Sequence, residues 1–293
     1  MTAKKTSPAK KTVDGNDILY KLFKSLLEKD KDLAIDVVRE MIIKTAVWFP
    51  VKTYQRIPIL LPWVVRDNSC KGTPAGNQWG APNALGFVRD DNTMVKDILR
   101  PLRISGPNDS PLNGLTVSKG FVTSHVWREV NLEVLANKDS RLNTFIPNLV
   151  WLPKQISKLS DLEGGLVQTA LKATAWNLYR NVPIESSLHQ SIEDVWNELP
   201  KPELLSHFDF APDELNFLKI EESFYESRKK VFHNYITFIH QSVEGTEVVP
   251  KGIRTRYVNE LPNVDTTVLA KTLAIVRAHT SSEMSPDLLI PEK

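Results

Sequence analysis

Two apolar runs, each ending at a polar or breaking residue, constrain the fold of this chain more than any other feature. The first run contains the strand formers Phe121 and Val122 and ends at His125. The second run begins after Asn148 and stops at Pro153. A short segment of mixed polar and apolar residues follows at once, and a proline at its start suits the first turn of a helix. The pattern therefore predicts strand, long loop, strand and helix, in that order.

This layout resembles the HNH endonucleases, which are ββα-metal nucleases, and especially those that lack zinc-binding cysteines. In that family the second strand and the helix read roughly Asn-Gly-Leu-Leu-Leu-Ser-Pro, then two variable residues and His-Lys-Leu-Phe-Asp. Here the same register runs from Asn148 through Pro153 to Asp161. The resemblance begins at Val117 and implies a small ββα-metal module over residues 115–163.

The resemblance implies a metal-dependent DNA endonuclease, with a restriction or defence role as the natural biological setting. Phosphodiester hydrolysis needs an activated water and a cation that stabilises charge on the phosphate. His125 would be the general base, since the pKa of an imidazole lies near neutral pH. Asn148 would hold the loop between the strands or orient the His125 ring. One divalent cation, Mg²⁺ or Mn²⁺, would lie between the first strand and the helix, where Lys154 and Lys158 would contact DNA.

Two positions depart from the family pattern. Many HNH sites have an acidic metal ligand directly before the histidine and a second His or Asn nine residues after the central Asn; this chain has Ser124 and Ser157 there. A hydroxyl is a poorer ligand than a carboxylate or an imidazole, although Mg²⁺ accepts oxygen ligands and keeps several waters. Three explanations stay open: weak metal binding completed by DNA phosphate, a ligand from elsewhere such as Asp139 or Asp161, or lost catalysis.

Composition narrows the class of protein. With 41% apolar and 25% charged residues, the 293-residue chain is typical of a globular protein with ample core. The longest apolar stretch, Ile57 to Val65, is interrupted by prolines, so no membrane partner is expected. A Lys-rich, polar N-terminus predicts no signal peptide and a cytoplasmic location. The single cysteine, Cys70, excludes an intrachain disulfide and a paired-cysteine zinc knuckle. A net charge of +2 means that DNA affinity requires local basic clusters.

The N-terminal part divides into a tail and a helical region. Residues 1–16 form a basic tail that its composition predicts to be disordered. From Asp17 to Phe49 apolar residues recur at helical spacing and predict two amphipathic helices, which would serve as scaffold or as the face of a homodimer. The stretch 50–111 is rich in Pro, Gly, Asn and Asp and predicts irregular structure with short strands. Residues 17–114 are thus expected to be a helical hairpin plus an irregular region.

One part of this irregular region carries candidate DNA contacts. Trp79 could stack on a base, and Arg89 could read a base edge. The polar cluster that follows Arg89 has a structural alternative, which we favour: Asn92 as the N-cap of a helix over 93–99, with the two preceding acids near the positive end of that helix.

The remaining chain, 164–293, is expected to be helical. Apolar residues show helical spacing in four stretches, 166–179, 184–199, 212–243 and 266–279. The fold class expected overall is α+β and mainly helical, with the ββα-metal module embedded between the two helical regions.

Two functions follow from these patterns. The first is a metal-dependent DNA endonuclease of HNH type, in which the helical remainder serves target recognition or dimerisation. The second is a catalytically degenerate HNH-like scaffold that binds DNA or another protein. Cleavage of plasmid DNA with Mg²⁺ or Mn²⁺, in the presence and absence of a chelator, distinguishes them.

Overall fold

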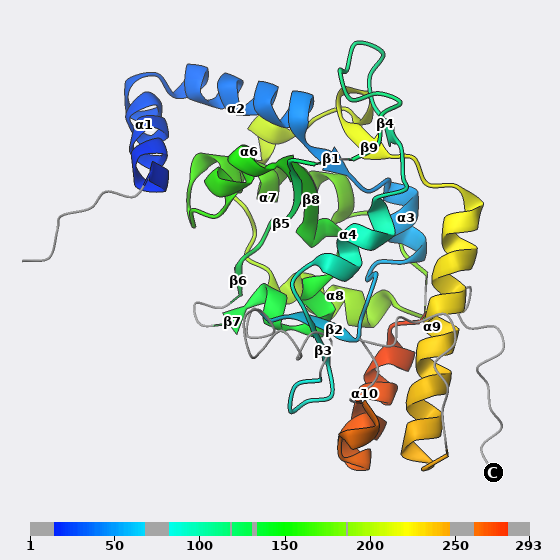
Figure 1. The fold of residues 1–293 in the computed structure, drawn as a ribbon. Helices are drawn as coiled ribbons and strands as arrows, with labels where there is room; N and C mark the ends of the chain where they lie inside the picture. The colour runs from blue at the N-terminus through cyan, green and yellow to red at the C-terminus, as the bar shows by residue number, and fades with distance from the viewer. Residues whose placement is uncertain are drawn as a thin grey trace, which may run out of the picture.

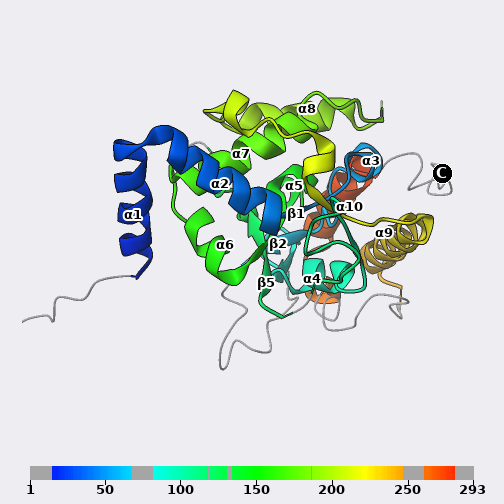
Figure 2. The ribbon, with the colours of Figure 1, turned by 90° about the horizontal axis from the view of Figure 1, so that it is seen from above.

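The protein is a mixed α+β structure, mainly helical, built around one five-stranded sheet (Figures 1 and 2). The computed structural model describes residues 15–67, 82–117, 119–130, 134–185, 187–246 and 261–280. The expected fold class, α+β and mainly helical, is confirmed at this level. The α-helices are α1 (Gly15–Lys29), α2 (Lys31–Thr45), α3 (Val51–Arg56), α4 (Thr93–Leu99), α5 (Ser140–Asn143), α6 (Lys154–Ser160), α7 (Leu166–Tyr179), α8 (His189–Glu198), α9 (Glu222–Val243) and α10 (Thr266–Ala278).

Five short strands form the central sheet, in the order β4-β9-β1-β8-β5. They are β1 (Val47–Trp48), β4 (Ile104–Ser105), β5 (Phe121–His125), β8 (Leu149–Pro153) and β9 (Asn216–Leu218). Strands β1 and β9 are parallel, and the other three neighbouring pairs are antiparallel. The sheet therefore takes strands from the N-terminal, middle and C-terminal thirds of the chain, and one hydrophobic core contains residues from all three.

Strand β8 lies inside the sheet because its residues are apolar on both faces. Leu149, Val150, Trp151 and Leu152 are all buried, as expected for a strand covered on both sides. Pro153 ends the strand, and α6 begins at the next residue. The expected strand and helix boundaries around Pro153 are therefore present in the structure.

Two smaller, two-stranded sheets lie outside the central sheet. Strands β2 (Val64–Arg66) and β3 (Val88–Asp90) pair in parallel, and β6 (Glu129–Val130) pairs with β7 (Val134–Leu135) in an antiparallel ribbon. Short 3₁₀ helices connect the larger elements: η3 (Ala136–Lys138), η4 (Ile146–Asn148), η5 (Leu205–Phe208), η6 (Pro212–Glu214) and η8 (Leu261–Asn263).

Helices cover the sheet on both sides. Helix α7 contacts α2, α3 and α6, whereas α4 contacts β5 on the opposite side (Figure 2). Much of the core is aromatic: the Trp196 ring packs edge-on against Trp127, Phe145 and Trp176, and its indole N–H donates to the Tyr54 hydroxyl at 2.8 Å. Such pairs add to the stabilisation from burial.

The C-terminal region differs from the expectation in two stretches. The helix expected over 184–199 begins only at His189, as α8. A helix over 212–243 was expected, but residues 212–221 contain η6 and β9, and α9 begins at Glu222. Asn216 explains this second difference. It is buried in β9 opposite Val47, and its amide donates to the Ile43 carbonyl at 2.7 Å, so tertiary pairing decides the local conformation.

The two N-terminal helices are present as expected, and the Asp30 side chain caps α2 by accepting from the Leu33 amide. Ile18, Leu22, Leu33 and Val37 are exposed on them, 42–60% of each side chain being accessible. The expected homodimer face on these helices stays a prediction. None of the helices in the described ranges is long and apolar enough to cross a membrane.

Candidate functional site

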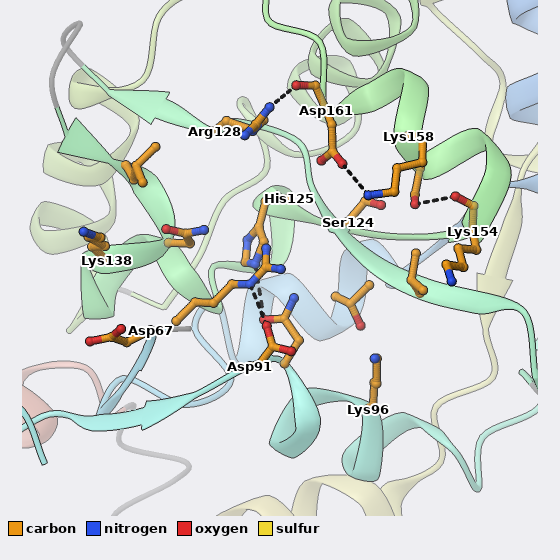
Figure 3. A pocket seen from close by; sticks show the side chains of 17 residues that line it. Asp67, Asp91, Lys96, Ser124, His125, Arg128, Lys138, Lys154, Lys158 and Asp161 are labelled. Atoms are coloured by element: carbon orange, nitrogen blue, oxygen red, sulfur yellow. Dashed lines mark hydrogen bonds and ion pairs between the residues drawn. The ribbon is translucent and has the colours of Figure 1, made fainter. Parts of the chain in front are cut away.

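Strands β5 and β8 and helix α6 form a contiguous unit at the positions that the sequence pattern indicated. The strands are antiparallel with Phe121 opposite Pro153 and His125 opposite Leu149, and α6 follows β8 directly. Helix α6 also contacts β5. The last residues of β5 and the first turns of α6 therefore lie close together, and Figure 3 shows their side chains around one pocket.

This first pocket has a volume of about 660 Å³ and is strongly basic. Its charged lining consists of six lysines or arginines and three aspartates: Arg66, Lys96, Arg128, Lys138, Lys154, Lys158, Asp67, Asp91 and Asp161. The remaining polar lining comes from Asn92, Thr123, Ser124, His125, Asn137 and Ser157. Because the whole chain carries a net charge of only +2, this excess of positive charge is local. Such a concave basic surface favours a phosphate ligand.

His125 lies at the inner wall of the first pocket. Its side chain is only 6% exposed, and burial, assisted by the positive charges of Arg66 and Arg128, lowers its pKa to about 3. The ring is therefore neutral at neutral pH. Its Nε2 lies 3.3 Å from the Asn92 Oδ1, an atom that can only accept, so this contact places the ring proton on Nε2. The lone pair is then on Nδ1, which is buried and has no hydrogen-bond partner in the described ranges.

Asn92 does not play the role that the sequence suggested. It occupies the N-cap position of α4, but its side chain makes no capping hydrogen bond, and its backbone is left-handed with a φ of 59°. Asp90 caps the helix instead, its carboxylate accepting from the Met94 amide at 2.9 Å. Asn is among the residues that adopt this conformation most readily. The turn therefore points the Asn92 amide at His125 rather than at the helix.

Asn148 holds the two ends of the long loop together. It is fully buried at the end of η4, directly before β8. Its Oδ1 accepts from the Trp127 amide at 2.7 Å, and its Nδ2 donates to the Leu142 carbonyl at 2.9 Å. Asn148 was expected either to hold the loop between the strands or to orient the His125 ring, and these contacts match the first role. Asn148 is not part of the pocket lining, and the ring of His125 is held by Asn92.

Ser124 and Ser157, the positions considered for metal binding, both line the first pocket. Ser157 is in the second turn of α6 and donates to the Lys154 carbonyl at 2.9 Å, which leaves its oxygen lone pairs available. Of the two alternative ligands, Asp161 lines the pocket, whereas Asp139 does not and accepts from Arg141. Residues of the described ranges include no group of three or more His, Cys, Asp or Glu side chains able to hold a metal.

The donor set decides how a divalent cation could fit. Two serine hydroxyls are neutral, and hard cations in proteins are held mainly by carboxylates. The carboxylate of Asp161 lies 3.6 Å from the Lys158 ammonium, and Asp91 lies 3.2 Å from Arg66. The serines alone thus do not make a preformed site. They fit a weak site in which a phosphate ligand supplies further oxygens.

The residues considered for DNA binding fall into three groups. Lys154 and Lys158 line the first pocket from α6, and both are exposed. Arg89 lies on β3 opposite Val65 and is not part of the lining. Trp79 falls outside the described residues.

Several lining residues were not found from the sequence. Arg66 ends β2, Lys96 is in α4, and Arg128 follows His125 by three residues; the Arg128 guanidinium donates to the Asp161 carbonyl. Arg66 lies in a stretch whose pattern is irregular, so no register was available to direct its side chain. Lys96 lies in the helix expected over 93–99, but the pattern did not show which element that helix packs against. The proximity of Arg128 to His125 in sequence was the one signal that could have been used.

Comparison of the chain with models of protein families, with curated proteins and with solved structures found no match.

Proposed function

We propose that this protein is a metal-dependent DNA endonuclease of the HNH type. One observation carries the proposal: Ser124 and His125 from the first strand, and Lys154, Ser157 and Lys158 from the following helix, line a single basic pocket. These are the elements and the order that a ββα-metal nuclease requires. The Asn148 contacts that hold the intervening loop are consistent with the same architecture.

His125 is the proposed general base. A neutral imidazole whose Nε2 proton faces Asn92 keeps its lone pair on Nδ1. Nδ1 is buried in the ligand-free pocket, so the proposal requires that DNA binding opens it to the attacking water. The low pKa of the ring in the ligand-free pocket reflects burial and the charges of Arg66 and Arg128. A phosphate bound between those guanidinium groups offsets their charge and makes the ring more basic in the complex with DNA.

The basic residues around His125 are proposed to hold the DNA backbone. Guanidinium groups match phosphate oxygens in a forked geometry, and both Arg66 and Arg128 line the pocket together with His125. Lys96 and Lys154 make no ion pair with any residue in the described ranges, so their charges are available to phosphate. In this arrangement, affinity comes from the backbone and is independent of sequence.

The divalent cation would be held by Ser124 and Ser157, with Asp161 as the nearest acidic group of the lining. When bound, a divalent cation stabilises the negative charge that develops on the phosphate. The site requires millimolar Mg²⁺ or Mn²⁺ because its protein ligands are mostly neutral. A restriction or defence role is what the HNH resemblance implies for such an activity.

The test is cleavage of supercoiled plasmid DNA by purified protein with Mg²⁺ or Mn²⁺, with and without a chelator. His125→Ala should lower the cleavage rate by about 100- to 10,000-fold while leaving DNA binding intact. His189→Ala changes an exposed histidine at the start of α8, outside the pocket, and should cleave like the wild type. Equal rates for His125→Ala and wild type would place the chemistry elsewhere.

A second candidate is a catalytically degenerate scaffold that binds DNA through the same basic pocket. The weak donor set favours it: serines at both expected ligand positions, and no group of three His, Cys, Asp or Glu side chains in the described ranges. The Ser157→His variant separates the two candidates, because it restores the nitrogen ligand common in the family. If neither wild type nor Ser157→His nicks DNA with any cation, while both bind it, the scaffold is the better description.

A further inference from the structure

A second pocket, of about 580 Å³, lies beside α4 and is separate from the one that holds His125. The two pockets share no residue, although α4 contributes Lys96 to the first and Asp97 and Ile98 to the second. The second pocket is lined by Asp97, Ile98, Pro101, Leu102, Arg103, Lys219, Glu221, Ser223, Phe224, Ser227 and Arg228. Its lining residues come from the end of α4, the connection to β4, the connection from β9 to α9, and the first two turns of α9.

Arg228 is the unusual residue of this pocket. Its side chain is 7% exposed, and its Nη1 is buried without a hydrogen-bond partner. It forms no ion pair with any residue in the described ranges. Burial lowers the pKa of the guanidinium to about 10, so the group still carries its charge at neutral pH. A buried charge without a partner is strongly unfavourable, and native proteins almost always compensate such a group.

The other charges of the second pocket do not compensate Arg228. Glu221 lies 3.6 Å from the Lys219 ammonium, and Asp97 lies 3.7 Å from Arg100. Arg103 adds a further positive charge at the exposed rim. The lining therefore has one buried positive charge and no acid paired with it.

The rest of the lining is suited to an apolar group. Ile98, Leu102 and Phe224 contribute apolar surface, and the hydroxyls of Ser223 and Ser227 lie nearby on α9. The N-terminal end of this long helix carries a partial positive charge, which adds to the attraction for an anion.

We propose that the second pocket binds a small organic carboxylate, whose carboxylate pairs with Arg228 and whose apolar part packs against Ile98, Leu102 and Phe224. A single negative charge matches the single buried positive charge. A phosphate monoester would bring a second negative charge into a partly apolar site without a buried partner, which is unfavourable. This site is independent of the nuclease function proposed for the first pocket.

Benzoate and benzamide are suitable probes, because they have nearly the same shape and differ in charge. Binding to the full-length protein is measured by titration calorimetry and by ligand-observed NMR. Benzoate should bind the wild type about tenfold or more tightly than benzamide, since a charge-assisted hydrogen bond is lost with the amide. Arg228→Met should lose benzoate binding by a similar factor. Arg66→Gln, which removes a positive charge from the first pocket, should bind benzoate like the wild type.

A second variant provides a test that does not depend on the folding of Arg228→Met. Ser227 is exposed at the pocket lining, so Ser227→Phe fills the pocket without disturbing the core and should also abolish benzoate binding. Without ligand, Arg228→Met should melt at a higher temperature than wild type, because it removes an uncompensated buried charge.

The proposal is overturned if benzoate does not bind the wild type at millimolar concentration, or if benzamide binds equally well. It is also overturned if benzoate binding survives Ser227→Phe, or if inorganic phosphate displaces benzoate at lower concentrations than benzoate itself requires. The last result would identify a site for inorganic anions. None of these outcomes depends on DNA cleavage, so failure here and failure of the proposed nuclease are distinguished.

Discussion

Asn92 combines a left-handed backbone with a contact to the His125 ring, and these two properties can be separated by mutation. Glycine adopts a positive φ without strain, whereas alanine there costs roughly 1–2 kcal/mol. Asn92→Gly should therefore keep a thermal stability close to wild type but lower the cleavage rate, because the ring loses its partner. Asn92→Ala should lower both the melting temperature and the cleavage rate.

The cleavage rate and the melting temperature are measured for both variants. The pH dependence of the cleavage rate is measured as well, because a purely structural role of Asn92 would leave it unchanged. Loss of the Asn92 amide should alter that pH profile in Asn92→Gly, because the ring nitrogen gains a different environment. An unchanged rate and profile in Asn92→Gly would mean that Asn92 does not position His125.

Glu163 provides a pH-dependent contribution to stability at the start of α7. Burial alone would raise the pKa of its carboxyl, but hydrogen bonds from Gln168 at 2.7 Å and Lys172 at 2.6 Å outweigh it and lower the pKa. Because the pKa of Glu163 is lower in the folded state, its ionised carboxylate stabilises the folded protein at pH values above the ordinary carboxyl pKa of 4.5. This contribution to stability is lost as the pH falls through the pKa of the folded state.

The melting temperatures of wild type and Glu163→Gln should therefore differ at pH 7 and converge in the acidic range below the ordinary carboxyl pKa. Glu226→Gln, an exposed carboxylate on α9, serves as the control and should change little at either pH. A difference that stays constant from pH 7 into that acidic range would show that the Glu163 charge is not responsible.

At the scale of elements, Asn148 connects the entry of β8 to the loop that precedes it. Replacing it by alanine leaves the Trp127 amide and the Leu142 carbonyl without partners in the core. Unsatisfied buried groups cost about 1–3 kcal/mol each, so Asn148→Ala should lower the free energy of unfolding by about 2 kcal/mol or more. Urea denaturation measures this.

Asn197→Ala is the matched control, because Asn197 is exposed on α8 and the change there should stay within about 0.5 kcal/mol. If Asn148→Ala were as stable as that control, the loop would be held by its other contacts, and the structural role assigned to Asn148 would be wrong.

At the scale of the whole molecule, a nearly neutral chain presents a strongly basic pocket, so DNA binding should depend on salt through a small number of phosphate contacts. Lys154→Ala and Lys158→Ala should each weaken binding uniformly across DNA sequences. Each should reduce the slope of log K against log salt by about 0.9. Binding is measured by fluorescence anisotropy over a range of NaCl concentrations.

Lys201→Ala removes an exposed lysine outside the pocket and should leave the salt slope unchanged. Equal slopes for all three variants would show that the lysines of α6 do not contact the phosphates and that DNA binds at another surface.

The sequence determined the elements whose formation depends on neighbouring residues. The apolar run 149–152 and Pro153 were sufficient to predict β8 and the start of α6, and helical spacing located α7 closely. These features depend on backbone preferences and on the period of apolar residues, both of which can be read locally. The strand-strand-helix order also predicted that His125 and Ser157 lie close together, and both line the first pocket.

Only the tertiary structure decided which distant residues meet at the site. Asn92 and Lys96 reach the first pocket because α4 lies against β5, and Arg66 at the end of β2 lines the same pocket; no local pattern encodes that packing. The same holds for β9, where a helix was expected: Asn216 pairs with β1 and donates to the Ile43 carbonyl, two partners far away in the chain. The spacing of apolar residues specifies local conformation. The grouping of charged side chains in one pocket and the pairing of strands depend instead on contacts between segments far apart in the sequence, which that spacing does not encode.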